Sequence, residues 1–200
     1  ALAGWSVEDS TTALMPVLKL SAATGADLAT TSDLVTDSMA NLGLGIGDLN
    51  HYLDVSATAN NKSNQTAMQL QEAYLGVGGV LKNLNSPIEE SAAVLGVLAN
   101  RGTKGSEAGT ALNAILVNMQ KQSGDAYEAM SKLGVSMYDS SGKARSIIDV
   151  FQEISDKTAG MTEENRNLMY QMIGGKSHLD SFAKIMQGFT TDTADGQKEV

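Results

Sequence analysis

The sequence has no cysteine and very little proline or aromatic content. Without cysteine there is neither a disulfide framework nor a thiolate metal site. Proline occurs only at Pro16 and Pro87, so little in the sequence prevents long helices. Aromatic residues make up 4% of the chain, which means that a core must be built mainly from Leu, Ile, Val, Met and Ala.

Positive charge is also scarce. The net charge is −9. Residues 1–100 hold three lysines against ten acidic residues, and residues 101–200 hold eleven basic against thirteen acidic residues. Neither half offers a basic face for phosphates, so sequence-specific nucleic-acid binding is not expected. No apolar run approaches the ~20 residues of a membrane span, and nothing resembles a signal peptide.

Apolar residues recur at helical spacing along most of the chain. Five stripes are each about as wide as the core-facing side of a helix. They consist of Ile88, Ala92, Leu95 and Ala99; Leu112, Ile115, Leu116 and Met119; Ile147, Ile148, Phe151 and Ile154; Leu168, Met169, Met172 and Ile173; and Leu179, Phe182, Ile185, Met186 and Phe189. We therefore predict helices over these segments.

Signals for helix starts and stops agree with the stripes. Ser86 precedes Pro87 and Glu89, which predicts a Ser N-cap, Pro at the first helical position and a closing Glu. Ser6, followed by Glu8 and Asp9, is predicted to begin a helix by a weaker form of the same device, and Thr162 precedes Glu163 and Glu164, whose charges suit the start of a helix. Predicted helix ends are marked by Gly102, Gly134, Gly160 and the pair Gly174 and Gly175. The fold class is thus predicted as all-α, a multi-helix bundle of about eight helices joined by Gly-rich turns.

One stretch departs from helical periodicity. Residues 134–138 alternate apolar and polar side chains, and residues 139–142 have turn chemistry. We predict a short hairpin or extended element near 134–145, too short to form a sheet.

Domain organisation follows from the same pattern. Residues 1–189 are predicted to form a single helical module of a longer protein, with a division into sub-bundles 1–85 and 86–189 left open. The run 190–200 is predicted to be a polar tail or a linker into a further segment. A faint internal echo, in which Val7–Ser10 with Leu14 and Leu18 resembles Ile88–Ser91 with Leu95 and Leu98, suggests a duplicated helical hairpin.

Residues that could carry chemistry are few and scattered. His51 and His178 lack the converging partners of a metal or general-base site. Ser181 and Lys184 fit the S-x-x-K pattern, but no companion motif accompanies them, and Phe182 and Ile185 fit a core-facing helix side. We predict no catalytic, cofactor-binding or metal-binding residues.

Acidic pairs and glycine clusters also have simple structural explanations. The pairs Glu89–Glu90 and Glu163–Glu164 fall in first helical turns, where the helix dipole favours acids over a glycosidase-like pair. The clusters 43–47 and 76–79 match no phosphate-binding spacing. Such glycines let helices bend or pack closely, and a hinge or a close helix–helix contact in an oligomer is the functional version of that hypothesis.

Several motifs together carry a family resemblance. They are Ile88–Ser91, the run Leu95–Leu112, Leu133–Val135 followed by Asp139–Arg145, and Met172–Gly175. In this order they resemble the core region of phage tail tape measure proteins of the lactococcal siphophage type. The resemblance covers most of residues 20–190, and it departs from the family at Met172 and Ile173, where Ile-Phe is common.

The resemblance implies a structural protein of the virion. Tape measure proteins are mostly helical, fill the lumen of the tail tube as a few parallel copies, set the tail length and leave during genome ejection. The implied partners are further copies of the chain, the tail tube protein, tail assembly chaperones and tail-tip proteins, with host-membrane contact during ejection. The implied location is the tail tube lumen of the virion, and the host cytoplasm during assembly. No catalytic residue and no cofactor come with this region.

Two other classes of function stay open from the residues alone. One is a tail-associated cell-wall hydrolase, which requires a catalytic acid or metal triad. The other is a secreted helical pore-forming or interaction protein, which would share the small-residue helices and the low charge.

Overall fold

A computed structural model describes residues 5–190, and this part of the chain is all-helical as predicted. It has ten α-helices, close to the predicted eight. They are α1 (Val7–Thr24), α2 (Leu28–Leu42), α3 (Leu49–Lys62), α4 (Ala67–Asn83), α5 (Ile88–Asn100), α6 (Gly105–Met119), α7 (Asp125–Leu133), α8 (Ile147–Thr158), α9 (Glu163–Gly174) and α10 (Leu179–Thr190). Two short 3₁₀ helices, η1 (Ile46–Asp48) and η2 (Lys176–His178), precede α3 and α10. Apart from Thr190, the predicted tail at 190–200 lies outside the described residues.

The helix starts follow the sequence signals with one correction. Ser6 and Asp9 form a reciprocal capping box, because the Ser6 hydroxyl accepts from the Asp9 N–H at 3.0 Å and the Asp9 carboxylate accepts from the Ser6 N–H at 3.2 Å. The predicted Ser86 cap is wrong. Helix α5 begins at Ile88, and Pro87 occupies the N-cap position with no side-chain hydrogen bond to the helix.

The predicted glycine stops are correct in part. Gly134 ends α7 in a left-handed conformation with φ of 69°. Gly175 ends α9, whereas Gly174 is still inside that helix. At Gly160 the prediction is wrong, because α8 has already ended at Thr158 and the left-handed glycines of the described chain do not include this one.

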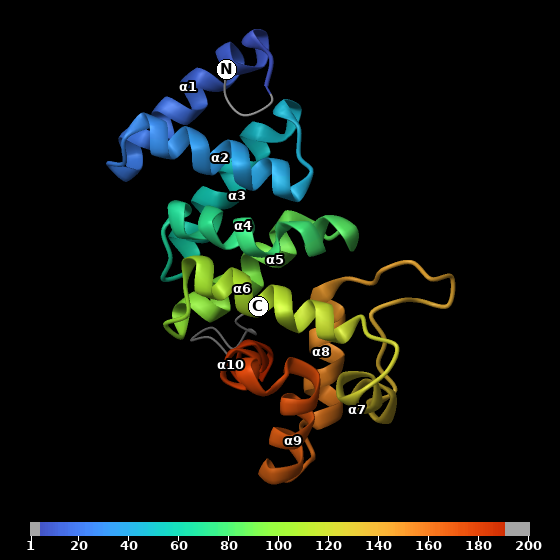
Figure 1. The fold of residues 1–200 in the computed structure, drawn as a ribbon. Coiled ribbons are helices and arrows are strands. Elements are labelled where there is room, and N and C mark those ends of the chain that lie inside the picture. Colours follow the sequence, from blue (N-terminus) through green and yellow to red (C-terminus); the bar gives the residue numbers. More distant parts are fainter. Residues whose placement is uncertain (1–4, 191–200) are drawn as a thin grey trace.

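The first two thirds of the chain stack as helical hairpins in two rows. One row consists of α2, α4 and α6, which lie in successive contact in Figure 1. The other row consists of α1, α3 and α5, again in successive contact. Each second-row helix also packs on the following first-row helix, as α1 does on α2, α3 on α4 and α5 on α6. This neighbour-to-neighbour packing is typical of α-solenoids.

A repeat of 38–39 residues underlies the stack. First-row helices begin at Leu28, Ala67 and Gly105, which are 39 and 38 residues apart. Their buried positions recur at the same spacing: Thr31, Leu70 and Ala108; Val35, Tyr74 and Leu112; Ser38, Val77 and Ile115; Leu42, Leu81 and Met119. The helices that follow share it too: Leu49, Ile88 and Ala126; Tyr52, Ser91 and Ala129; Ser56, Leu95 and Leu133. The repeat therefore preserves burial more than residue identity.

The duplicated hairpin expected from the sequence exists, but its register is different. Ala13 and Val17 of α1 are buried one period before Tyr52 and Ser56. Leu14, which the sequence comparison aligned with the buried Leu95, is half exposed instead. Helix α1 thus occupies the position of a second-row helix, one period before α3.

The regular stack changes after α6. The next neighbours of α5 are α10 and α8, while α7 packs mainly against α9 (Figure 1). Aromatic rings fill this lower part of the molecule. Phe151 lies 6.2 Å from Phe182 and 5.9 Å from Phe189, and Tyr170 lies 5.3 Å from Phe182, measured between ring centroids. Helices α8–α10 therefore close this end of the stack, and their rings belong to the same hydrophobic cluster as the buried residues of the hairpins.

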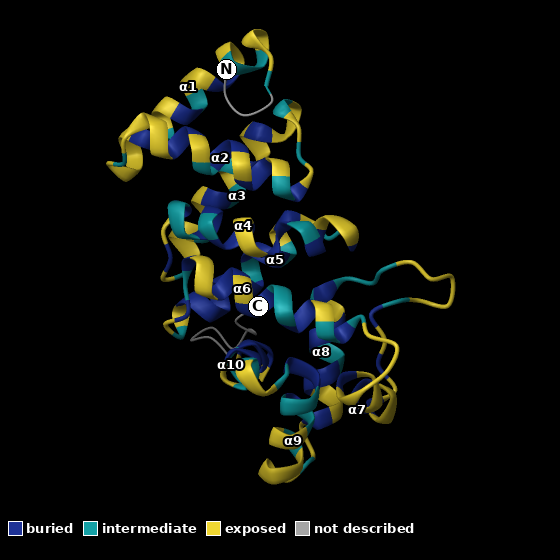
Figure 2. Cartoon of the chain, viewed as in Figure 1, coloured by how far each residue is buried: buried dark blue, intermediate teal, exposed yellow. Residues whose placement is uncertain are grey.

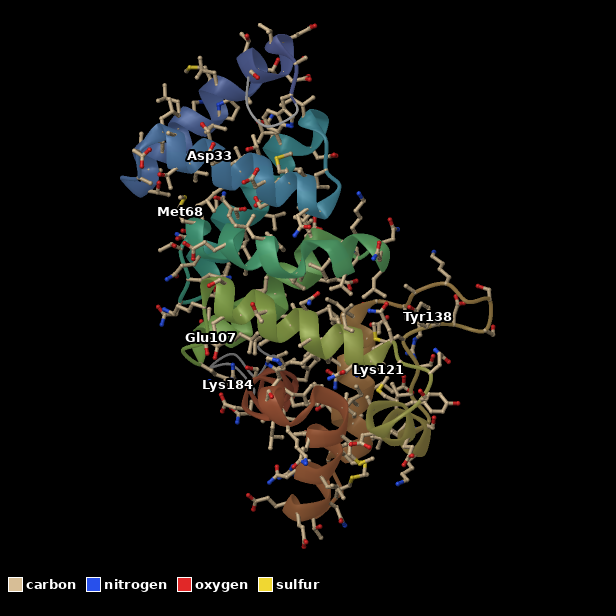
Figure 3. All side chains as sticks on the ribbon, in the orientation of Figure 1. Asp33, Met68, Glu107, Lys121, Tyr138 and Lys184 are labelled. Carbon is tan, nitrogen blue, oxygen red and sulfur yellow. The ribbon has the colours of Figure 1, made fainter. Side chains whose placement is uncertain are left out.

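Most of the predicted stripes face the core, as the burial pattern in Figure 2 shows. The stripe on α9 is the exception. Leu168 is exposed and Met169 and Met172 are half-buried, while Tyr170 and Ile173 supply the packing face. The predicted hairpin near 134–145 is an extended loop closed by one antiparallel bridge between Tyr138 and Ala144, and Figure 3 shows Tyr138 where this loop projects from the helices.

Candidate functional site

His51 and Glu89 form an ion-pair contact between α3 and α5. His51 Nε2 lies 2.8 Å from Glu89 Oε1, and both side chains are more than half exposed. Exposure of this kind makes the pair a weak electrostatic contact between neighbouring repeats. Asp48, in η1, and Asp54, on α3, take no part in it. The histidine thus sits at an inter-repeat surface.

A groove of about 520 Å³ runs along that surface between α3 and α5. Its walls are built largely from small or short apolar side chains: Val55, Ala59, Ala92, Ala93, Gly96 and Val97. His51, Asp54 and Glu89 stand at one end, and Lys62, Ser63 and Asn100 at the other. The helices approach closely near Gly96, where an added Cβ would lie 3.2 Å from the Ser63 Cβ. The groove can hold apolar side chains, and its polar ends can orient them.

The S-x-x-K pair is part of a structural tether. Lys184 Nζ lies 2.6 Å from Asp180 Oδ2 and donates to Thr103 Oγ1 at 2.9 Å. Thr103 is buried in the turn between α5 and α6. Ser181 is buried on the same face of α10 as Phe182 and Ile185. Lys184 therefore holds α10 to the hairpin stack.

The acidic pairs have different surroundings. Glu90 Oε2 accepts a hydrogen bond from the Ile147 N–H at 2.9 Å, which fixes the start of α8 to α5. Its neighbour Glu89 contacts His51 instead. Glu163 and Glu164 are exposed in the first turn of α9, as their dipole explanation predicts. The two pairs lie on separate helices, and no paired-carboxylate geometry results.

His178 and the first glycine cluster fall in helix connections. His178 is half-buried at the end of η2. Gly43 ends α2 in a left-handed conformation, and Gly45 precedes η1, with its N–H donating to Asp48 at 2.9 Å.

The second glycine cluster lies inside α4 and makes close helix contacts. Asn41 Nδ2 donates to the Tyr74 and Leu75 carbonyls at 2.8 and 2.9 Å, and a Cβ at Gly78 would meet that amide at 2.9 Å. At Gly76 a Cβ would lie 3.2 Å from the Gly109 backbone. The close helix contact expected of these glycines is therefore made within the chain.

A buried tyrosine pair was not predicted from the sequence. Tyr52 and Tyr74 are fully buried, with ring centroids 6.1 Å apart. The Tyr52 hydroxyl lies 2.6 Å from Ser38 Oγ, and the Tyr74 hydroxyl donates to the Ile88 carbonyl at 3.1 Å. Burial raises the pKa of both phenols well above the ordinary value of 10.0. The sequence signal that could have found them is helical spacing from a buried leucine, because Tyr52 lies three residues after Leu49 and Tyr74 lies four residues after Leu70.

Two further features concern the part of the chain that the structure describes. Across residues 5–190, His, Asp and Glu side chains do not gather into groups of three that could hold a metal ion. Among the described helices, none combines the length and apolarity needed to cross a bilayer.

Comparison with known proteins assigns the family. The sequence profile of the phage-related minor tail protein family matches residues 1–175. The tape measure protein of Pneumococcus phage Dp-1 is 32% identical over 186 residues, which are 93% of this chain and 16% of that protein. No solved structure matches the chain. The tape measure resemblance is thus confirmed, a structural role in the virion tail follows from it, and the chain belongs to the phage-related minor tail protein family.

Proposed function

We propose that this chain is a segment of a tape measure protein that sets tail length, lies in the lumen of the tail tube and leaves during genome ejection. The observation that carries the proposal is the alignment of 93% of the chain with the Dp-1 tape measure protein. In the same proposal, residues 1–189 act as one helical module, and residues 190–200 lead into a further segment. Its partners are other copies of the chain, the tube protein, assembly chaperones and tail-tip proteins, with host-membrane contact during ejection.

The hairpin repeat supports a ruler. A chain can set the tail length only if each added segment lengthens the tail by a constant increment. Hairpins with a fixed 38–39-residue period and the same buried positions supply such an increment along the stack. Glu90 and Lys184 each tie two helices of the fold together, which agrees with a structural role.

An in-frame deletion of one hairpin tests two points together: whether the chain sets tail length, and whether its hairpins lie stacked or as continuous helix in the tube. Residues 67–104 span α4, α5 and the turn to α6, and this is one period of 38 residues. If the segment lies in the tube as continuous helix, their loss shortens the tail by about 57 Å, at ~1.5 Å per residue. If the hairpins stay stacked, the tail shortens by about 10 Å, the spacing of packed helices.

Tail lengths are measured by electron microscopy of phage that carry the deletion or a tandem duplication of residues 67–104 in the parental gene. A matched control replaces surface residues in the same segment, such as Lys82→Gln, without changing its length. Shortening in one and lengthening in the other by the same increment supports the ruler. Intact particles with unchanged tails in both would contradict it.

A further inference from the structure

The contact between α2 and α4 contains a buried amide without hydrogen bonds. Gln71 of α4 is fully buried. Among the residues that the structure describes, neither its side-chain nitrogen nor its side-chain oxygen has a hydrogen-bond partner. Gln71 lies two helical turns before Gly78, at which an added Cβ would meet the Asn41 amide of α2, so Gln71 is on the side of α4 that faces α2. Burial of an unpaired amide destabilises the closed contact.

The α2 side of this contact is also polar. Asn41 donates to the Tyr74 and Leu75 carbonyls of α4. Ser38, which is fully buried three residues earlier, lies 2.6 Å from the hydroxyl of Tyr52, whose ring packs on Tyr74. Amide and hydroxyl groups form comparable hydrogen bonds with water, so their burial adds little to the stability of the closed contact.

The next contact in the same row, between α4 and α6, is apolar. The residues that take the places of Asn41, Ser38 and Gln71 one period later are Val80, Val77 and Gly109. Both valines are buried, and the glycine lets α6 approach the backbone of α4. Separation of α4 from α6 would expose apolar surface, whereas separation of α2 from α4 would hydrate polar groups. Two equivalent contacts of the repeat therefore differ in the free energy that their opening requires.

The second-row side of the same boundary is weakly packed as well. Helices α3 and α5 leave the groove of about 520 Å³ between them, and the His51–Glu89 pair at its end is exposed. Gln65, in the turn from α3 to α4, is buried, and its side-chain nitrogen has no hydrogen-bond partner in the described part of the chain. That nitrogen lies 3.8 Å from the Cβ position of Gly96 in α5. Gln65 and Gln71 thus both lie at the boundary between α1–α3 and the helices that follow (Figure 1).

We propose that the hairpin stack opens along this boundary, with α1–α3 moving away from α4 about the turn at residues 63–66. The opened state hydrates the amides of Gln65 and Gln71 and separates the rings of Tyr52 and Tyr74. Such partial opening occurs where the contact between two units is weaker than the packing inside each of them. The inference concerns how the fold opens and does not depend on the ruler role.

Thiol labelling measures the opening in the full-length protein expressed from the parental gene. Ser38→Cys places a buried thiol at the α2–α4 contact, and Val77→Cys places one at the same position of the next repeat. An alkylating reagent reaches either thiol only when its contact opens. After labelling, the protein is digested, and the peptide that carries residue 38 or 77 is quantified by mass spectrometry. Cysteines elsewhere in the full-length protein therefore do not affect the result.

The thiol at residue 38 is expected to react about tenfold faster than the thiol at residue 77, within the range that an unpaired buried amide costs. Adding Gln71→Leu replaces the unpaired amide by an apolar side chain of similar size. This change should slow labelling at residue 38 about tenfold and leave the rate at residue 77 unchanged. Gln152→Leu is the matched control, because it makes the same change on α8 at an amide that donates to Asp156, and it should alter neither rate.

Two results would overturn the proposal. The first is labelling at residue 38 that is no faster than labelling at residue 77, which is measured without any change at Gln71. The second is an unchanged or higher rate at residue 38 alone when Gln71→Leu is added, since the amide would then not weaken the contact. Fast labelling at both residues would mean that the leucine variant does not fold. Gln71→Met, which keeps the unbranched shape of glutamine, then replaces it and should give the same slowing.

Discussion

Gly109 of α6 lies directly against the carbonyl oxygen of Ala73 in α4: a Cβ placed on Gly109 would stand 2.1 Å from that oxygen. The atom in the way is backbone, so no side-chain rotation relieves the overlap. This contact sets how closely two consecutive hairpins of the stack approach each other.

Gly109→Ala should therefore destabilise the protein. Moving α6 away from α4 would loosen contacts around Tyr74, Leu112 and Ile115, and we expect a loss of about 2–4 kcal/mol, typical of severe overpacking. Urea unfolding followed by circular dichroism measures the change. Gly160→Ala is the matched control, since its Cβ meets nothing within 4 Å, and it should be neutral or slightly stabilising. Equal stabilities of the two variants would contradict the close packing.

Stability should fall at alkaline pH because of the buried phenols. Burial holds the pKa of Tyr52 and Tyr74 above the 10.0 of an exposed tyrosine, so the unfolded chain releases these protons first. Their contribution is complete below pH 10 and is lost as pH rises above it, by up to about 1.4 kcal/mol per pH unit for each phenol.

Denaturant unfolding between pH 8 and 11.5 tests this dependence. A Tyr52→Phe, Tyr74→Phe double variant should be less stable at pH 8, because the Ser38 and Ile88 partners lose their hydrogen bonds. Its stability should also decline less steeply above pH 10. Tyr127→Phe, at an exposed position of α7, should keep the slope of the unmodified chain. Identical slopes for all three proteins would exclude the buried phenols as the cause.

Glu90→Ala should release the start of α8 from α5. The carboxylate accepts the Ile147 N–H at 2.9 Å, a charge-assisted bond to the positive end of a helix. We expect a loss of about 1–2 kcal/mol and faster hydrogen exchange at the first turn of α8. Glu163→Ala removes an exposed first-turn acid of α9 and should cost about 0.5 kcal/mol. If exchange in α8 does not change, Glu90 does not anchor that helix.

A peptidoglycan zymogram tests the hydrolase alternative. Lys184 is tied to Asp180 and Thr103, and the acidic pairs lie apart, so we expect no clearing of the gel. A cleared band at the mobility of the chain that is still present in the Glu90→Ala and Lys184→Ala variants would show that other residues of the chain are catalytic. Helical circular dichroism of the same preparation confirms that the sample is folded.

Prediction of buried residues from the sequence was most successful where a helix is packed on several sides. Leu95, Leu112 and Phe182 were placed in the core by spacing alone, and each is fully buried. It failed at Leu168, because α9 lies at the edge of the molecule and packs through a narrow face that contains Tyr170. It also failed at Ser86, since Pro87 can itself adopt the extended N-cap conformation and leaves the hydroxyl one residue too early.

The repeat and the candidate site were harder to predict for a physical reason. Tyr52, Ser91 and Ala129 occupy equivalent buried positions although their volumes differ widely. The repeat is therefore seen in which positions are buried, and hardly at all in which residue types occupy them. The groove is formed where side chains are small, between segments near Ala59 and Ala93 that are distant in sequence. Small side chains leave no periodic signal, whereas the His51–Glu89 contact requires the stacking of two repeats to be known first.

The tether from Lys184 to Thr103 has a mechanical consequence. Contacts among the hairpins join neighbours along the chain, so a pulling force applied at the amino end would peel them away one at a time. Each released period of 39 residues could extend to roughly 130 Å, at ~3.3 Å per residue. Lys184 of α10 instead contacts Thr103 in the α5–α6 turn, 81 residues earlier in the sequence. Under this force the hairpins would unfold one after another as far as α5. Unfolding would then stop until the contact between α10 and the α5–α6 turn breaks.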